Sequence, residues 1–254
     1  MAPVSVLVDP IRALRSFGVE EGGSFSEKVL YIYMKQLEEA DLVIISKCDL
    51  LDDARLASLR AAISARFPGK ATLAVSPREG IGLEPWFAKI AQEEQAAGTA
   101  MAVDYAVYAD GEALLGWLNW TAQLAATEAF DGNNYLRELA GEMQRRLQAS
   151  NAEVAHLKMT LSPDSGQWDI AAVNLVRDDF VPELSMALTQ PVRRGRLLIN
   201  LRAEAAPDVL GSAVHDALAA AGRKFPTLWA TTERLEQFRP GKPMPTHRIE
   251  GIAA

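Results

Sequence analysis

The chain has 254 residues, of which 49% are hydrophobic and 23% charged, a balance that is ordinary for a globular protein and argues against disorder. The formal net charge is −7 and neither half of the sequence is basic, which argues against nucleic acid and anionic membranes as partners. The single cysteine, Cys48, excludes an internal disulfide framework. The sequence shows no secretory signal and no apolar run long enough to cross a bilayer, and it therefore predicts a cytoplasmic location.

The first third of the chain alternates short apolar strands with amphipathic helices. Strands that are apolar on both faces are predicted at 4–8, 41–46 and 71–75. Three helices are predicted: one at about 26–39, one that begins after a cap at Asp52 or Asp53, and one from Glu84 onwards. Apolar strands separated by such helices form a parallel sheet covered on both faces, so the predicted fold class is α/β.

The pattern changes after a polar, alanine-rich segment at 92–98, which predicts a domain boundary at about residue 99. Two pairs of strands are then predicted, at 105–108 with 113–120 and at 154–161 with 168–176, and a further strand is predicted at 196–201. A hairpin turn is expected at Asp110-Gly111, and helices are expected at 134–149 and 207–221. The sequence therefore predicts a partial parallel sheet with flanking helices over 1–98, followed by an α+β domain over 99–254.

The tetrad Ser46-Lys47-Cys48-Asp49 directly follows the second predicted strand. Ligands of open α/β sheets bind beyond the carboxyl ends of the strands. One carboxylate there can accept hydrogen bonds from both N1–H and the exocyclic amine of guanine, a donor pair that adenine lacks. The tetrad thus predicts guanine recognition by Asp49, with the aliphatic stem of Lys47 across the purine. The alternative interpretation is a strand that ends in a solvated Lys/Asp loop.

Three stretches of the sequence resemble the CobW-like GTP-binding proteins, a family of P-loop GTPases that includes metal chaperones and insertases. They are Val6–Pro10, Leu37–Leu51 and Arg239–Arg248. The resemblance implies a P-loop-GTPase-type sheet, GTP as the ligand and guanine as the base that the tetrad reads. It also implies a role as a metallochaperone, in cobalt- or zinc-type cofactor delivery to a metal-dependent client protein.

A second candidate loop, Ser76-Pro77-Arg78-Glu79-Gly80, follows the next predicted strand. The resemblance implies that this loop brings a backbone N–H group to the guanine O6. Pro77 has no N–H, so the contact would have to come from Ser76 or Arg78. The expected nucleotide-binding residues are therefore Ser46, Lys47, Asp49, Ser76 and Arg78, and the sequence predicts neither a catalytic residue nor a metal ligand.

The sequence departs from the family where the phosphates would bind. It has no Gly-x-x-x-x-Gly-Lys-Ser/Thr loop, no preceding acidic strand end for magnesium and no Cys-x-Cys-Cys metal motif. We therefore expect a truncated or split protein that hydrolyses GTP only with an upstream P-loop half, which would supply the magnesium site, and that holds no cofactor alone. The expected partners are that half, or a second copy through the open edge of the incomplete sheet.

The alternative function is a non-catalytic protein-interaction module in which the nucleotide site is vestigial. The three histidines, His156, His215 and His247, are too scattered to predict a metal cluster. Trp117 and Trp120 could form a ligand platform, but aromatic residues in strands more often belong to the core.

Overall fold

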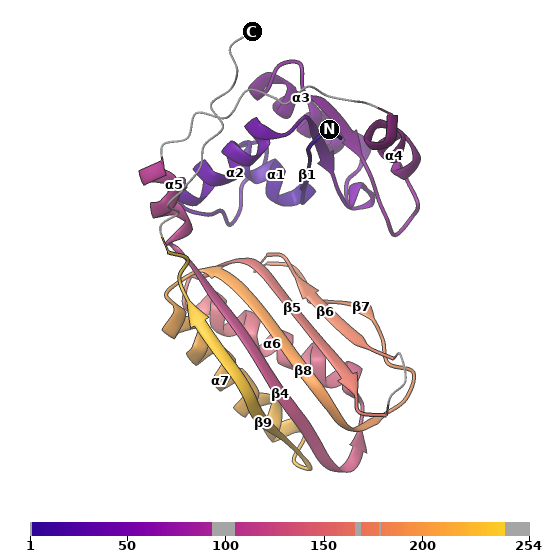
Figure 1. Ribbon diagram of the computed structural model, residues 1–254, viewed down its shortest axis with the longest axis vertical. Coiled ribbons are helices and arrows are strands. Elements are labelled where there is room, and N and C mark those ends of the chain that lie inside the picture. The colour runs from indigo at the N-terminus through magenta and orange to yellow at the C-terminus, as the bar shows by residue number, and fades with distance from the viewer. Residues whose placement is uncertain (1, 93–104, 166–168, 178, 242–254) are drawn as a thin grey trace. The chain divides into compact units, whose positions relative to one another are not determined.

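A computed structural model describes residues 2–92, 105–165, 169–177 and 179–241 (Figure 1). Within them the chain forms two compact units that divide between Gly111 and Glu112. The first contains a parallel three-stranded sheet and the second an antiparallel six-stranded sheet, each with helices, so the predicted fold class is confirmed. The boundary predicted at residue 99 falls in 93–104, outside the described residues.

The parallel sheet of the first unit has the order β1 (Ser5–Val8), β2 (Leu42–Ile45), β3 (Ala71–Ala74). All three strands run in the same direction, so their carboxyl ends share one edge of the sheet. Every residue of the central strand β2 is buried. This explains why its sequence is apolar without alternation.

Helices pack on both faces of this sheet. On one face, α1 (Pro10–Ser16), α2 (Glu27–Glu39) and α3 (Asp53–Arg66) contribute to a core around Val43 and Ile45. On the other face, α4 (Leu83–Gln92) packs Leu83 and Trp86 close to Leu42 and Ile44. The helix predicted to follow Asp52 or Asp53 is capped by Asp52, whose carboxylate accepts a hydrogen bond from the Arg55 amide at 2.8 Å.

Strand β1 lies at an edge of the three-stranded sheet as far as the described residues extend. Leu7 of this strand and Val4 just before it are each 52% exposed, whereas Val8 is buried. Parallel sheets normally bury both faces. The expectation that an upstream half or a second copy pairs with this edge remains a prediction.

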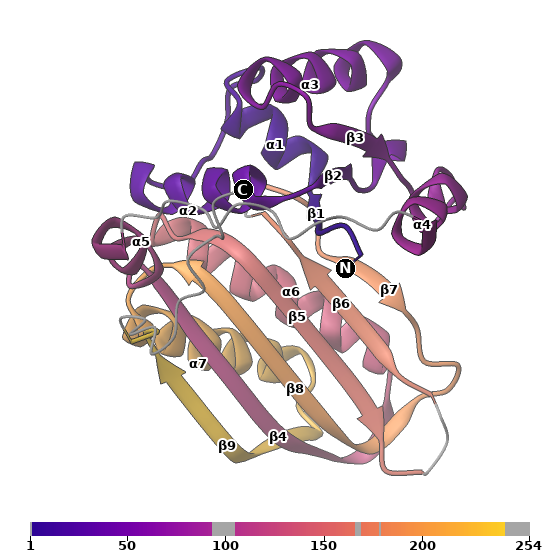
Figure 2. The ribbon, with the colours of Figure 1, turned by 45° about the horizontal axis from the view of Figure 1, so that its top comes forward.

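The second unit has the strand order β7-β6-β5-β8-β4-β9, with antiparallel pairing throughout. The strands are β4 (Leu115–Phe130), β5 (Glu153–Pro163), β6 (Ala171–Leu175), β7 (Glu183–Met186), β8 (Val192–Glu204) and β9 (Leu228–Phe238). Helices α6 (Gly132–Ala149) and α7 (Pro207–Lys224) lie side by side on one face of this sheet (Figure 2). Alternate residues of β4, such as Leu118 and Leu124, point into the core beneath them.

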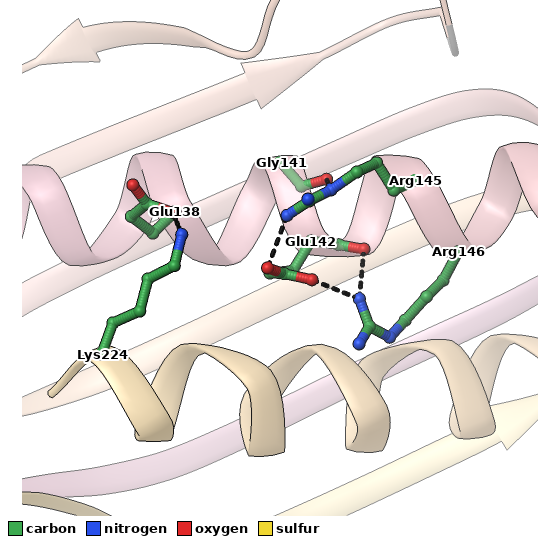
Figure 3. A network of polar contacts seen from close by, with 6 residues as sticks. All are labelled: Glu138, Gly141, Glu142, Arg145, Arg146 and Lys224. Atoms are coloured by element: carbon green, nitrogen blue, oxygen red, sulfur yellow. Dashed lines mark hydrogen bonds and ion pairs between the residues drawn. The ribbon is translucent and has the colours of Figure 1, made fainter. Parts of the chain in front are cut away.

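Polar contacts lie on α6 and between α6 and α7 (Figure 3). The carboxylate of Glu142 on α6 pairs with Arg145 and Arg146, each at 2.5 Å, and Lys224 of α7 pairs with Glu138 of α6. The hydrogen bond from Arg146 holds the pKa of Glu142 below its usual value. Glu142 therefore stays ionised at neutral pH although it is buried, with only 9% of its surface exposed.

The hairpin predicted at Asp110-Gly111 is wrong, because these residues belong to the helix α5 (Tyr105–Glu112). The position holds glycine because it packs against α2, where a Cβ would lie 2.6 Å from the Lys28 carbonyl oxygen. The glycine thus marks a close approach between helices rather than a turn. Among the described residues no helix combines the length and apolar character needed to span a bilayer.

Candidate functional site

The predicted nucleotide-binding residues lie in two loops at the carboxyl edge of the three-stranded sheet. One loop follows β2 and contains Ser46, Lys47 and Asp49, and the other follows β3 and contains Ser76 and Arg78. The backbone N–H of Cys48 donates to the carbonyl oxygen of Val75 at 3.1 Å, so the two loops are joined directly. The structure therefore brings the two sequence motifs together, as expected for strands that are neighbours in a parallel sheet.

Ser46 connects the end of β2 with the end of β1. Its hydroxyl donates to the Val8 carbonyl oxygen at 2.7 Å, and its backbone N–H donates to the same oxygen at 3.0 Å. Both donors are thus used inside the protein. Ser46 positions the start of the loop and does not present its hydroxyl to a ligand in this arrangement.

Lys47 adopts a left-handed backbone conformation, with φ 50° and ψ 41°. This conformation costs a non-glycine residue about 1–2 kcal/mol, and such strain gathers at functional sites. Its ammonium lies 3.5 Å from the Asp9 carboxylate, which is located just beyond β1. The side chain of Lys47, 38% exposed, is therefore held at its tip while part of its stem remains accessible.

Asp49 is exposed on the short 3₁₀ helix Cys48–Leu50 that follows Lys47. The neighbouring Cys48 is buried, and burial, followed by the charge of Asp49, raises the pKa of its thiol. Cys48 is therefore protonated at neutral pH and suited to packing rather than to metal binding or nucleophilic attack. The loop thus buries Cys48 in the core and exposes the carboxylate of Asp49.

The loop after β3 is a tight turn closed on itself. Ser76 is fully buried, and its backbone N–H and C=O each form a hydrogen bond of 3.0 Å with Ile81. Its hydroxyl accepts a hydrogen bond from the Glu79 amide at 3.3 Å. The backbone N–H of Ser76, one of the two donors predicted to meet the base, is thus occupied within the loop.

Two residues that the sequence analysis did not select also shape the site. The first is Asp9, which pairs with Lys47. The second is Gly82, which has a φ of +70° and lies so close to β3 that a Cβ at this position would be 2.1 Å from the Ala74 carbonyl oxygen. The pattern Gly80-x-Gly82 after an apolar strand was the available signal for a tight turn. Asp9 before Pro10 was the signal for a helix start.

Near these loops, the N-terminus of α1 is not suited to binding a phosphate. The turn after β1 leads into α1, whose N-terminus is capped by the Asp9 carboxylate accepting from the Arg12 amide at 3.1 Å. A carboxylate in that position repels an anion. No group of three or more His, Cys, Asp or Glu side chains in the described parts of the chain could hold a metal ion, and His247 lies outside them.

No protein-family model and no curated protein matches the sequence. Two similar solved structures are the Zn(II)-bound YjiA GTPase from E. coli and a Zn(II)-bound triple mutant of YjiA GTPase. The first is 12% identical with a TM-score of 0.27, over 85% of this chain and 61% of that chain. The second is 14% identical with a TM-score of 0.28, over 87% of this chain and 61% of that chain. The present chain thus spans about three fifths of the length of these structures, and similarity at this level does not identify what it binds.

Proposed function

We propose that the first unit recognises a guanine base, as the C-terminal portion of a CobW-like GTP-binding protein. The observation that carries the proposal is the exposed carboxylate of Asp49, which stands on a turn fixed by the strained Lys47 and by the Cys48–Val75 hydrogen bond. A carboxylate fixed at a strand end can accept both donors of guanine at once. Lys47, whose ammonium is tethered to Asp9, would lay its aliphatic stem across the purine.

Asp49 differs from the other predicted residues in what its polar groups already contact. The Ser46 hydroxyl and the Ser76 backbone N–H form hydrogen bonds inside the unit. These two serines therefore hold the loops in place, and base selectivity in the proposed site rests on Asp49. Phosphate binding, magnesium and GTP hydrolysis would belong to an upstream P-loop half, which the proposal requires for activity.

The resemblance to CobW-like proteins adds the biological setting to the proposal. The protein would act in delivering a metal of the cobalt or zinc type. The six-stranded unit would face the metal-dependent client protein.

The isolated chain is expected to bind guanine nucleotides with a dissociation constant no tighter than about 1 mM, because the phosphate cradle and magnesium supply most nucleotide affinity. In an NMR titration, millimolar GMP should shift the amides of residues 46–50 and 76–80, whereas AMP at the same concentration should not. Micromolar binding of GTP to this chain would show that it contains a phosphate site. Equal shifts with GMP and AMP would contradict base recognition.

Asp49→Asn is expected to abolish the GMP response and to produce a response to XMP. An amide presents one acceptor and one donor to the two donors of guanine, a loss of about 1–3 kcal/mol, whereas xanthine offers the complementary pair. Asp53→Asn is the matched control, because Asp53 is also exposed in this segment and does not form the α3 cap. An unchanged preference for GMP in Asp49→Asn would exclude Asp49 as the base reader.

The second candidate function is a protein-interaction module with a vestigial nucleotide site. It is favoured by the internal hydrogen bonds of Ser46 and Ser76, which remove two of the predicted base contacts. The same NMR titration separates the two candidates. Absence of any guanine-specific shift, with the fold intact, would favour the interaction module.

A further inference from the structure

The six-stranded sheet ends in a long edge strand. β9 (Leu228–Phe238) pairs with β4 alone among the described strands, whereas the opposite edge is formed by β7, which has only four residues. All residues of β9 except Leu228 and Glu236 are exposed. Trp229, Leu235 and Phe238 are 52%, 50% and 43% exposed. A long, partly apolar edge strand is a template for pairing with another strand.

A β-bulge determines which side chains of β9 share a face. Thr121 of β4 pairs with Arg234 and Ala122 pairs with Thr232, so Glu233 is an extra residue. The face of the sheet away from α6 and α7, called the open face, carries Arg196, which binds Glu233 at 2.8 Å. The register with β4 places these β9 residues on the open face: Trp229, Thr231, Glu233, Arg234, Glu236 and Phe238.

The bulge makes β9 complementary to itself in one antiparallel register. When Glu233 lies opposite Arg234 of a second copy, every open-face residue meets an open-face residue: Glu233 with Arg234, Thr231 with Glu236, and Trp229 with Phe238. The helix-side residues meet likewise, Ala230 with Gln237 and Thr232 with Leu235. Because the pairing is symmetric, each contact occurs twice, as in a two-fold dimer.

The side-chain contacts in this register are favourable. Phe238 already stacks on Trp117 of β4, with ring centroids 6.0 Å apart and an interplanar angle of 23°. Trp229 of the second copy would extend this aromatic row across the boundary. Cross-strand aromatic pairs and opposite charges both stabilise antiparallel strands.

Neighbouring registers are less favourable. A shift that places Glu233 opposite Glu236 brings like charges together. A shift that places Glu233 opposite itself does the same, and it also sets open-face residues against helix-side residues. Charges and bulges commonly protect edge strands from pairing. In β9 they disfavour these shifted registers and favour the one with Glu233 opposite Arg234.

We propose that β9 of one chain pairs antiparallel with β9 of a second copy, with Glu233 opposite Arg234, to form a continuous twelve-stranded sheet across two chains (twice the six strands of one). This dimer is independent of the proposed guanine site and of the β1 edge. It buries one strand edge on each side, so it is a small interface of the weak, reversible class.

Sedimentation velocity of the full chain tests the dimer, with loading concentrations from about 1 to about 200 µM, a range that suits a small interface. Glu233→Arg and Arg234→Glu should each weaken dimerisation by about tenfold or more, because like charges then face each other twice. A one-to-one mixture of the two variants should dimerise again, since opposite charges are restored. Lys158→Glu is the matched control, because it changes an exposed charge on β5 of the same sheet, away from the edge, and should leave the dimer unchanged.

A cysteine pair tests the register. Thr231→Cys with Glu236→Cys should form disulfides only between copies, because the two positions lie about 16 Å apart within one strand. Thr231→Cys with Gln237→Cys, which places the thiols on opposite faces, should not cross-link, and native Cys48 is buried. A chain that stays monomeric at about 200 µM, a dimer indifferent to both charge variants, or a mixture that fails to associate would each overturn the proposal.

Discussion

Ile45→Asp is expected to unfold the three-stranded unit while the six-stranded unit stays folded. Ile45 is fully buried in the central strand, so the substitution places an unpaired carboxylate in the core. Such a change costs of order 5 kcal/mol, comparable to the whole stability of a small unit. The cores around Val43 and around Leu139 have no residue in common, so the loss should not spread.

Amide NMR spectra report the two units separately in this experiment. Signals of residues 42–45 should collapse into the unfolded range, while those of α6 keep their positions. Leu157→Asp, at a fully buried position of β5, should give the opposite result. Ala61→Asp, on the exposed side of α3, controls for added charge and should cost less than about 1 kcal/mol. Simultaneous loss of both sets of signals would show that the units fold as one cooperative body.

The elements that could be predicted from the sequence have a buried face with a clear period. β2 is apolar at every position because it lies between two helical layers, and α6 repeats its apolar residues at helical spacing. The loops of the site were also predictable, because in a parallel sheet the ends of neighbouring strands share an edge. The sequence therefore predicts that Asp49 and the Ser76 loop lie at the same edge of the sheet.

The elements that were missed or wrong depend on contacts made far along the chain. β9 is exposed on nearly every residue and carries Glu233, Arg234 and Glu236, so it has no apolar alternation. It is a strand only because β4 supplies its hydrogen-bond partner. α5 includes Gly111 because the α2 backbone leaves no room for a side chain there. Local sequence contains neither fact.

The same limit applies inside the candidate site. The residue types of Ser46 and Ser76 suggested contacts to a base, but their hydrogen bonds run to Val8, Glu79 and Ile81. Which donors a loop uses internally depends on how tightly it turns. That tightness is set by two glycines, and it leads to a second prediction with a large expected effect.

Gly82→Ala is expected to destabilise the first unit by about 3 kcal/mol and to abolish its guanine response, whereas Gly80→Ala should cost only about 1 kcal/mol. Both glycines have left-handed φ values, +70° and +69°, so the conformational cost of a side chain is shared. Only at Gly82 would the new Cβ meet backbone, 2.1 Å from the Ala74 oxygen, while nothing lies within 4 Å of a Cβ at Gly80. The clash must move the Ser76–Ile81 turn away from β3 and, through the Cys48–Val75 hydrogen bond, disturb the Asp49 loop. Urea unfolding followed by amide signals of β2 and β3, together with the GMP titration, measures both effects. Equal losses at the two glycines would mean that backbone conformation alone sets the turn, and that contact with β3 does not hold the site together.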